Sequence, residues 1–310
     1  MARIYVEPWS PEYGAPIAFD PDLEVARVDA AVEVDGPWCS LAGSDDGIDR
    51  IALVDGTLRF DARLLVDGDD GPVPGLCGAY AVGAVLWDRC EPRSQIVEVK
   101  VGRVAVFASG RSYSVDAGEP LQYRAESVAG DDPALLGRHL HGLMRSAESA
   151  LTSQLAASGC FVIADGPLNE LASVDTVGYV KSHRVAYLDA EHNRLVGELG
   201  SGERTPLFAI GDYHRYAWYS GLAKREPGTH PWSAVARCEV PAVVGLQHAR
   251  FLAGRTTALL PCLSSPGYRD PRAPQNLIPI AGLEDLLHHR LGDRRLVYRS
   301  IRRAVAGAVA

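Results

Sequence analysis

The stretch that decides the fold is "IALVDGTLRF" at residues 51–60, where an apolar run meets Asp-Gly-Thr. A short apolar run predicts a buried strand, and Asp-Gly is typical of a turn. An ionised carboxylate at the end of a buried strand costs several kcal/mol to desolvate unless a cation or hydrogen bonds compensate it. We therefore expect Asp55 either to begin a turn or to build a site.

Strand patterns continue beyond this stretch. Alternating or apolar runs predict strands in "DRIALVDG" (49–56), "FDARLLVDG" (60–68), "GAYAVGAVLWDR" (78–89) and "SQIVEVKVGRVAVFASG" (94–110). We expect a tight turn between the first two and a hairpin within the last. Strand signals in succession favour an antiparallel meander.

The period then changes to that of a helix. Residues 133–158 carry an apolar stripe at three-and-four spacing, with Asp131 or Asp132 as the expected cap and Gly159 as the stop. The stripe consists of Leu136, Leu140, Leu143, Met144, Ala147, Leu151 and Leu155. The apolar strand "CFVIADGPL" (160–168) follows, and it again ends in Asp-Gly, at Asp165.

The remaining chain divides into three parts. Residues 192–262 alternate strand-like runs, "TTALLP" (256–261) among them, with Gly and Pro breaks, which predicts a β-rich segment. A Pro-rich loop at 263–276 precedes a C-terminal helix that we expect to break near Gly292. The aromatic cluster Tyr213, Tyr216, Trp218 and Tyr219 is open to three interpretations: core, protein interface or base-stacking surface.

Composition restricts the class of protein. The 310 residues are 47% hydrophobic and carry a net charge of −8, and no apolar window is long enough for a membrane span. The N-terminal residues do not resemble a secretory signal, so a cytoplasmic location is expected. Six cysteines without a Cys-x-x-Cys pair argue against a zinc site or a disulfide framework and are read as buried thiols.

Three acids fall at positions where separate elements can meet. Asp55 and Asp165 end predicted strands, and Glu148 lies on the long helix. Two strand ends and a crossing helix can converge at one edge of a sheet. Mg²⁺ and Mn²⁺ prefer carboxylate oxygens, and a pair of such ions stabilises both the attacking and the leaving oxygen in phosphodiester cleavage. The pattern therefore predicts a divalent-metal site.

The same residues carry a family resemblance. The motifs "LVDGT" (53–57), "LMRSAESAL" (143–151), "VIADGPL" (162–168) and "VGYVKSH" (177–183), and more weakly "ARCEVP" (236–241) and "PQNLIPIAGLEDLLHHRLGD" (274–293), resemble in order and spacing those of the NurA nuclease family. The resemblance implies an α/β fold, an RNase H-like mixed sheet flanked by helices. It implies one domain over 1–310, with 45–191 and 263–310 as the core and 192–262 as a β-rich insertion before the C-terminal helix.

The resemblance also implies a function. A family member would be a DNA nuclease dependent on Mn²⁺ or Mg²⁺, with 5′-to-3′ exonuclease and endonuclease activity in double-strand-break end resection. It would be a homodimer and the partner of a HerA-type hexameric helicase or ATPase. It would not associate with a membrane.

The residues that match the family's site follow from the motifs. Asp55, Glu148 and Asp165 match the catalytic and metal-binding acids, and Lys181 matches a cation that neutralises the scissile phosphate. Because "NLIPIAGLE" departs from the family pattern, Glu284 is the expected fourth ligand and Asp285 its reserve. The residues expected to contact DNA are Arg145, Lys181, Arg295 and Arg299.

Other interpretations stay open. Asp-Gly alone is usually a turn, Glu148 alone is usually on a solvated helix face, and the C-terminal arginines have the same ordinary explanation. A catalytically weak or inactive DNA-binding adaptor subunit of an ATPase is the alternative function, and a phosphatase or RNase using the same site is a third. A haloacid-dehalogenase-type nucleophile is excluded because Leu53 occupies its position.

Overall fold

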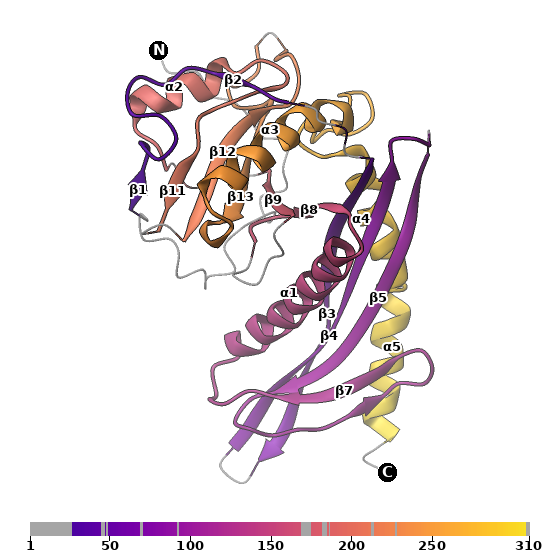
Figure 1. Cartoon of the computed structure of the whole chain (residues 1–310). Coiled ribbons are helices and arrows are strands. Elements are labelled where there is room, and N and C mark those ends of the chain that lie inside the picture. The colour runs from indigo at the N-terminus through magenta and orange to yellow at the C-terminus, as the bar shows by residue number, and fades with distance from the viewer. Residues whose placement is uncertain are drawn as a thin grey trace. The chain divides into compact units, whose positions relative to one another are not determined.

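The computed structural model describes residues 27–44, 47, 49–68, 71–91, 93–168, 175–181, 185, 187–211, 214–226 and 228–307 (Figure 1). The chain forms two compact units. The first unit consists of residues 1–53, 86–95 and 152–281, and the second of residues 54–85, 96–151 and 282–310. The elements β3, β4, β5, α1 and α4 contribute residues to both units.

The first unit contains a mixed sheet with the strand order β1-β11-β12-β13-β9-β8 and then the start of β3. Strands β8 and β9 are parallel, with Asp165 opposite Tyr179, and β13 pairs antiparallel with β9. The bounds are β1 Val28–Asp29, β2 Leu41–Ala42, β8 Phe161–Asp165, β9 Thr176–Val180, β10 Glu203–Arg204, β11 Phe208–Ile210, β12 Arg215–Gly221 and β13 Val235–Pro241. The short strand β10 joins β12 and β2 beside this path.

Helices cover both faces of this sheet. Helix α3 (Leu246–Leu263) buries its apolar side against one face in a cluster with Trp218, and α2 (Ala190–Glu198) packs against the other face in a cluster with Tyr219. Consecutive strand residues point to opposite faces, which explains why these two neighbouring aromatic residues belong to different clusters. A short 3-10 helix, η2 (Ala242–Val244), leads into α3.

The second unit is built on long strands in the order β3-β4-β5-β7-β6. Strand β7 runs parallel to β5, with Val104 opposite Arg124, and antiparallel to β6. The bounds are β3 Arg50–Gly68, β4 Gly71–Asp88, β5 Arg93–Phe107, β6 Val115–Asp116 and β7 Gln122–Ser127.

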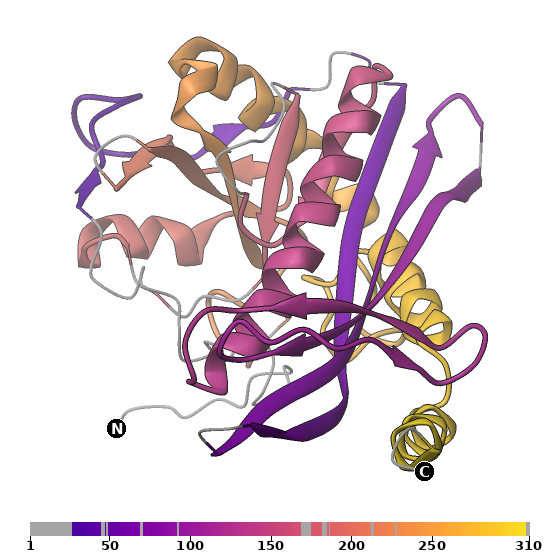
Figure 2. The same cartoon turned by 90° about the horizontal axis from the view of Figure 1, so that it is seen from below.

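The helices of this unit lie on opposite faces of its sheet, as Figures 1 and 2 show. A Cβ added at Gly78 of β4 would meet Leu140 of α1 (Ala134–Ala157), whereas one added at Gly83 would meet Leu283 and Leu287 of α4 (Ile278–Arg290). Even-numbered positions of β4 therefore face α1 and odd-numbered positions face α4. The last helix, α5 (Arg294–Gly307), follows α4 and buries Val297 and Ile301 in the same unit.

Local signals explain the helix ends. The N–H of Ala134 donates to Asp132 Oδ1 over 2.9 Å at the start of α1, and Gly159, with φ +82°, follows its end. Gly292, with φ +81°, separates α4 from α5, and Asp293 Oδ1 accepts the N–H groups of Arg295 and Leu296 at the start of α5. The predicted helix over 133–158, its Asp132 cap and the break near Gly292 are confirmed.

The mixed α/β architecture with flanking helices is as predicted, but several local expectations are wrong. Residues 50–68 form one continuous strand without the expected turn, and β5 ends at Phe107 without a hairpin of its own. The "TTALLP" run lies inside α3 because one side of this helix is buried in the core of the first unit. Among the described residues, no helix is long and apolar enough to cross a membrane.

Two expectations about side chains also change. Trp218 and Tyr219 are fully buried core residues, Tyr216 packs against the core, and Tyr213 lies outside the described residues. Three of the six cysteines, Cys39, Cys90 and Cys262, are exposed rather than buried. The division of 1–310 into one domain with a core and an insertion stays a prediction.

Candidate metal centre

Asp55 lies inside strand β3 rather than at its end. The residue is only 6% exposed, and the N–H of Gly56 donates to its Oδ1 over 2.7 Å. Four buried apolar residues, Ile51 to Val54, precede it and anchor this part of the strand. A carboxylate at such a position loses most of its hydration, so it must be compensated by hydrogen bonds or by a cation.

Helix α1 places Glu148 against the next residue of the same strand. A Cβ built on Gly56 would contact Glu148 Oε1 and lie 3.0 Å from Glu148 Cδ. Glycine is therefore the residue that leaves room for this carboxylate beside the strand. The Asp-Gly pair that usually signals a turn here provides one acidic side chain and the space for another.

The end of β8 carries a buried ion pair. Lys181 Nζ lies 2.8 Å from Asp165 Oδ2, and the two side chains are 1% and 11% exposed. The same ammonium group donates to Asn276 Oδ1 over 2.9 Å, and Asn276 Nδ2 donates to Asp270 Oδ2 over 2.7 Å. The ion pair, together with these hydrogen bonds, fixes the position of the Asp165 carboxylate.

The same network extends to the start of helix α4. Burial raises the pKa of Asp270, but hydrogen bonds from the Arg272 side chain, Asn276 and the Arg272 N–H outweigh it and leave this pKa below its ordinary value. Asp270 is therefore an anionic acceptor for Asn276, which lies two residues before Ile278, the first residue of α4. The side chain that holds Lys181 is thus attached to the helix that carries Glu284.

Helix α4 presents Glu284 one turn before His288. His288 Nδ1 lies 2.9 Å from the backbone oxygen of Glu284, and His288 Nε2 lies 3.2 Å from Thr57 Oγ1 on β3. A carbonyl oxygen only accepts, so Nδ1 carries the proton. The imidazole thereby links this turn of α4 to the strand segment that follows Asp55.

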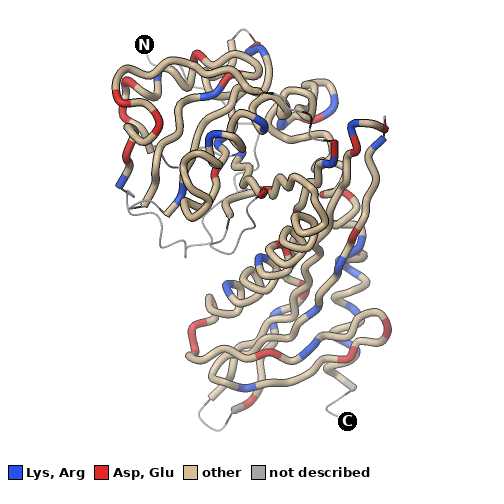
Figure 3. The backbone as a smooth tube through the Cα atoms, in the orientation of Figure 1, with Lys and Arg blue, Asp and Glu red and all other residues tan. Residues whose placement is uncertain are grey.

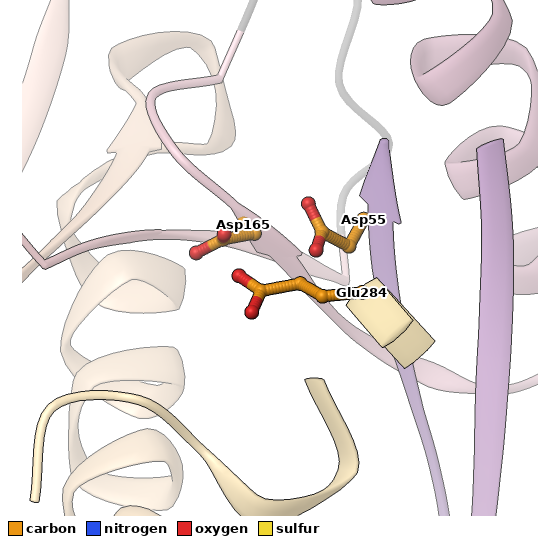
Figure 4. Close-up of side chains that lie close together, drawn as sticks. All are labelled: Asp55, Asp165 and Glu284. Atoms are coloured by element: carbon orange, nitrogen blue, oxygen red, sulfur yellow. The ribbon is translucent and has the colours of Figure 1, made fainter. Parts of the chain in front are cut away.

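Three of the predicted acids come together. One carboxylate oxygen from each of Asp55, Asp165 and Glu284 lies within 4.8 Å of the others (Figure 4). Asp55 is buried, and the other two are partly buried. Such crowding of negative charge raises the free energy of the folded protein unless a cation is bound.

This set of side chains fits a divalent cation. All three donors are carboxylate oxygens, the hard ligands that Mg²⁺ and Mn²⁺ prefer, and the described residues bring no cysteine into the group. Glu284, rather than the exposed Asp285, is the α4 residue that joins it. Glu148 is outside this group of three, and its role as a ligand stays a prediction.

The predicted DNA-contacting residues lie on different elements. Arg145 is partly buried on α1, Arg295 and Arg299 are exposed on α5, and Lys181 is buried beside Asp165. The structure thus gives Lys181 a carboxylate partner that the sequence did not indicate.

Two buried polar residues near Asp165 were not predicted. Asn276 is fully buried, and Glu239, on β13, is 1% exposed and accepts the N–H of Leu168 over 3.0 Å, three residues after Asp165. Glu239 and Arg237 are the two charged residues of a strand that is apolar at its other positions, "VARCEVP", and an acidic residue in such a run was a usable signal. Asn276 offered no comparable signal because it lies in the Pro-rich loop.

Comparison with known proteins gives a structural match. No protein-family model matches the chain, and no curated protein matches it in sequence. The structure is similar to the crystal structure of the NurA nuclease from Sulfolobus solfataricus, with a TM-score of 0.52, 10% sequence identity, and coverage of 87% of this chain and 88% of that chain. The chain therefore has a NurA-like fold over most of its length.

Proposed function

We propose that the protein is a divalent-metal-dependent nuclease that acts on DNA. The observation that carries the proposal is the approach of Asp55, Asp165 and Glu284 to within 4.8 Å of one another. Its support from the comparisons is the fold shared with a protein described as a nuclease.

The three carboxylates would hold Mn²⁺ or Mg²⁺, and the remaining ligands would come from water and phosphate oxygens. A bound ion of this kind supplies Lewis-acid stabilisation of the phosphoryl oxygens and lowers the pKa of a water nucleophile. Asp55 would bind the ion from β3 and Glu284 from α4, and His288 links the Glu284 turn to β3. Asp165 would bind it from the end of β8.

Lys181 and Glu148 have supporting roles in this proposal. The ammonium group of Lys181 contacts Asp165 Oδ2 and donates to Asn276 Oδ1, so it positions the Asp165 carboxylate. Glu148, held against Gly56, would accept a proton or a water hydrogen bond beside Asp55. Exonuclease and endonuclease activity in end resection, the homodimer and the HerA-type ATPase partner belong to the proposal through the resemblance in sequence.

The direct test is cleavage of labelled DNA in Mn²⁺ by four purified variants. Asp55→Asn, Asp165→Asn and Glu284→Gln keep the shape of the side chain and remove its charge, and we expect each to reduce the rate by about 10²-fold or more. Asp285→Asn is the matched control, because Asp285 is an exposed neighbour of Glu284 on the same helix. Wild-type rates in Asp55→Asn would rule out the assignment.

Metal binding gives a second readout that is independent of activity. If Mn²⁺ binds the folded protein, a concentration of 100 times Kd stabilises it by about 2.7 kcal/mol, which raises Tm by roughly 4 °C. We expect Asp55→Asn to lose this shift and Asp285→Asn to keep it. A wild-type protein that binds DNA but whose Tm does not change with Mn²⁺ would instead be the adaptor subunit.

A further inference from the structure

A cleft in the second unit lies between strand β3 and helix α5. Residues 60–63 of β3 and Arg294, Arg295 and Tyr298 of α5 line it, and its volume is about 480 Å³. We call it the arginine cleft. Cavities of this size accommodate a ligand of one or two nucleotides' bulk.

The arginine cleft is positively charged although the whole chain is acidic. Arg63, Arg294 and Arg295 line it. The buried carboxylate of Asp61 is already neutralised, because Arg59 Nε lies 2.7 Å from it and Arg103 Nη1 lies 3.7 Å from it.

The charge of the surrounding helix has the same sign. The carboxylate of Asp293 accepts the N–H groups of Leu296 and Arg295, which, with the nearby positive charges of Arg295 and Arg59, keep its pKa below the ordinary value. Among the residues that line the cleft, three are arginines and only Asp61 is acidic. Helix α5 itself contains five arginines and no acidic residue. Figure 3 colours the basic residues of the chain blue.

One exposed aromatic side chain completes the cleft. Tyr298 lines it and remains 46% exposed, which is unusual for a ring of this size beside a packed core. Phe60 also borders the cleft, but its ring lies against Gly137 of α1. Guanidinium groups recognise phosphates, and exposed aromatic rings stack on unpaired bases. The combination fits a single nucleic-acid strand better than a duplex, whose bases are already stacked on one another.

The chain connects this cleft to the carboxylates of the same unit. Phe60 follows Asp55 by five residues of the continuous strand β3, a path of about 17 Å. Arg294, the first residue of α5, lies ten residues after Glu284 along the chain. The strand that carries Asp55 thus continues into the arginine cleft, and α5, the helix that follows α4, lines it.

We propose that the arginine cleft binds a single-stranded segment of the DNA substrate a few nucleotides from the bond that is cleaved. Arg63, Arg294 and Arg295 would hold its phosphates, and Tyr298 would stack on its bases. This proposal rests on the proposed function, which it deepens by naming single-stranded DNA as the substrate class at this surface.

The test measures binding in EDTA, where no cleavage occurs. Fluorescence anisotropy would compare a labelled 20-nucleotide dT strand with a duplex of equal length. We expect tighter binding of the single strand, about tenfold weaker binding in Tyr298→Ala, and a loss of about 1.4 from the salt-dependence slope in Arg294→Gln/Arg295→Gln. Arg302→Gln/Arg303→Gln is the matched control, because it removes the same charge from exposed positions farther along α5.

Three outcomes would overturn the proposal. The first is an equal loss of affinity in both double variants, which would indicate only the general charge of α5. The second is tighter binding of the duplex, and the third is equal or tighter binding of oligo-rU. The two proposals fail separately, because binding in EDTA requires no metal, whereas cleavage by Asp55→Asn in Mn²⁺ tests the metal centre alone. The melting temperature of each variant confirms that it is folded.

Discussion

The buried pair of Asp165 and Lys181 allows a quantitative test of the site. Replacing Lys181 with Met leaves a carboxylate that is 11% exposed without its cation, and replacing Asp165 with Asn leaves an ammonium group that is 1% exposed without its anion. Breaking a buried ion pair by removing one partner costs about 3–5 kcal/mol. We therefore expect each single variant to lose about that much free energy of unfolding.

The double variant separates pairing from general damage to the core. Asp165→Asn/Lys181→Met removes both charges, so its loss should be smaller than the sum of the single losses, with a coupling energy of about 2 kcal/mol or more. Urea unfolding in EDTA, followed by the fluorescence of the tryptophans, measures these values. Lys224→Met is the matched control, since Lys224 is an exposed lysine of the same unit and should change stability by less than about 0.5 kcal/mol.

Two results would refute this reasoning. A loss below about 1 kcal/mol in Lys181→Met would mean that its ammonium group is not required by the buried carboxylate. Strictly additive losses in the double variant would mean that the two groups do not interact. Either result would return Lys181 to the role that its motif predicts, contact with the scissile phosphate.

Three further variants test other parts of the fold by urea unfolding. Burial raises the pKa of Glu33, but hydrogen bonds from Arg204 and a backbone N–H leave this pKa below its usual value. The ionised Glu33 carboxylate therefore stabilises the fold above about pH 4.5, and this stabilisation is lost as pH falls. Glu33→Gln should accordingly lose less stability between neutral and acid pH than the wild type. Arg59→Met should cost about 2–4 kcal/mol, because Arg59 donates to the carbonyls of Gly292 and Leu291, between α4 and α5, over 2.6 and 2.9 Å. An unchanged unfolding midpoint would contradict this. Gly78→Ala should cost about 1–3 kcal/mol through overpacking against Leu140, and a stability equal to that of the wild type would show that α1 shifts freely.

The sequence predicted those elements whose signals are local. The stripe of α1, its Asp132 cap and the glycine after α4 act within a few residues, and all are present in the structure. The Asp-Gly pair at Asp55 is also a local signal, but here it predicted a turn that the structure does not contain. Strand β3 continues through it because pairing with neighbouring strands, which the sequence does not show, overrides local preference.

The same contrast applies to the site. Asp55, Asp165 and Glu284 were identified by their order along the chain and by the resemblance that this order carries, and the structure brings their oxygen atoms together. The environment of Lys181 could not be predicted, because its second partner, Asn276, lies 95 residues away in a segment without periodicity. Contacts that depend on such distant pairing leave no pattern that a single sequence reveals.

The segment between α3 and α4 shows that irregular backbone is not always a tolerant linker. It contains buried polar residues, and its carbonyl and amide groups are bonded to the sheet: Tyr179 Oη donates to Gln275 O over 2.7 Å, and Gln275 Nε2 donates to the carbonyl of Val235 over 2.8 Å. Loops usually accept tags, reporter insertions and length changes because their backbone is solvated. This one is bonded into the sheet, so an engineer should place such additions elsewhere.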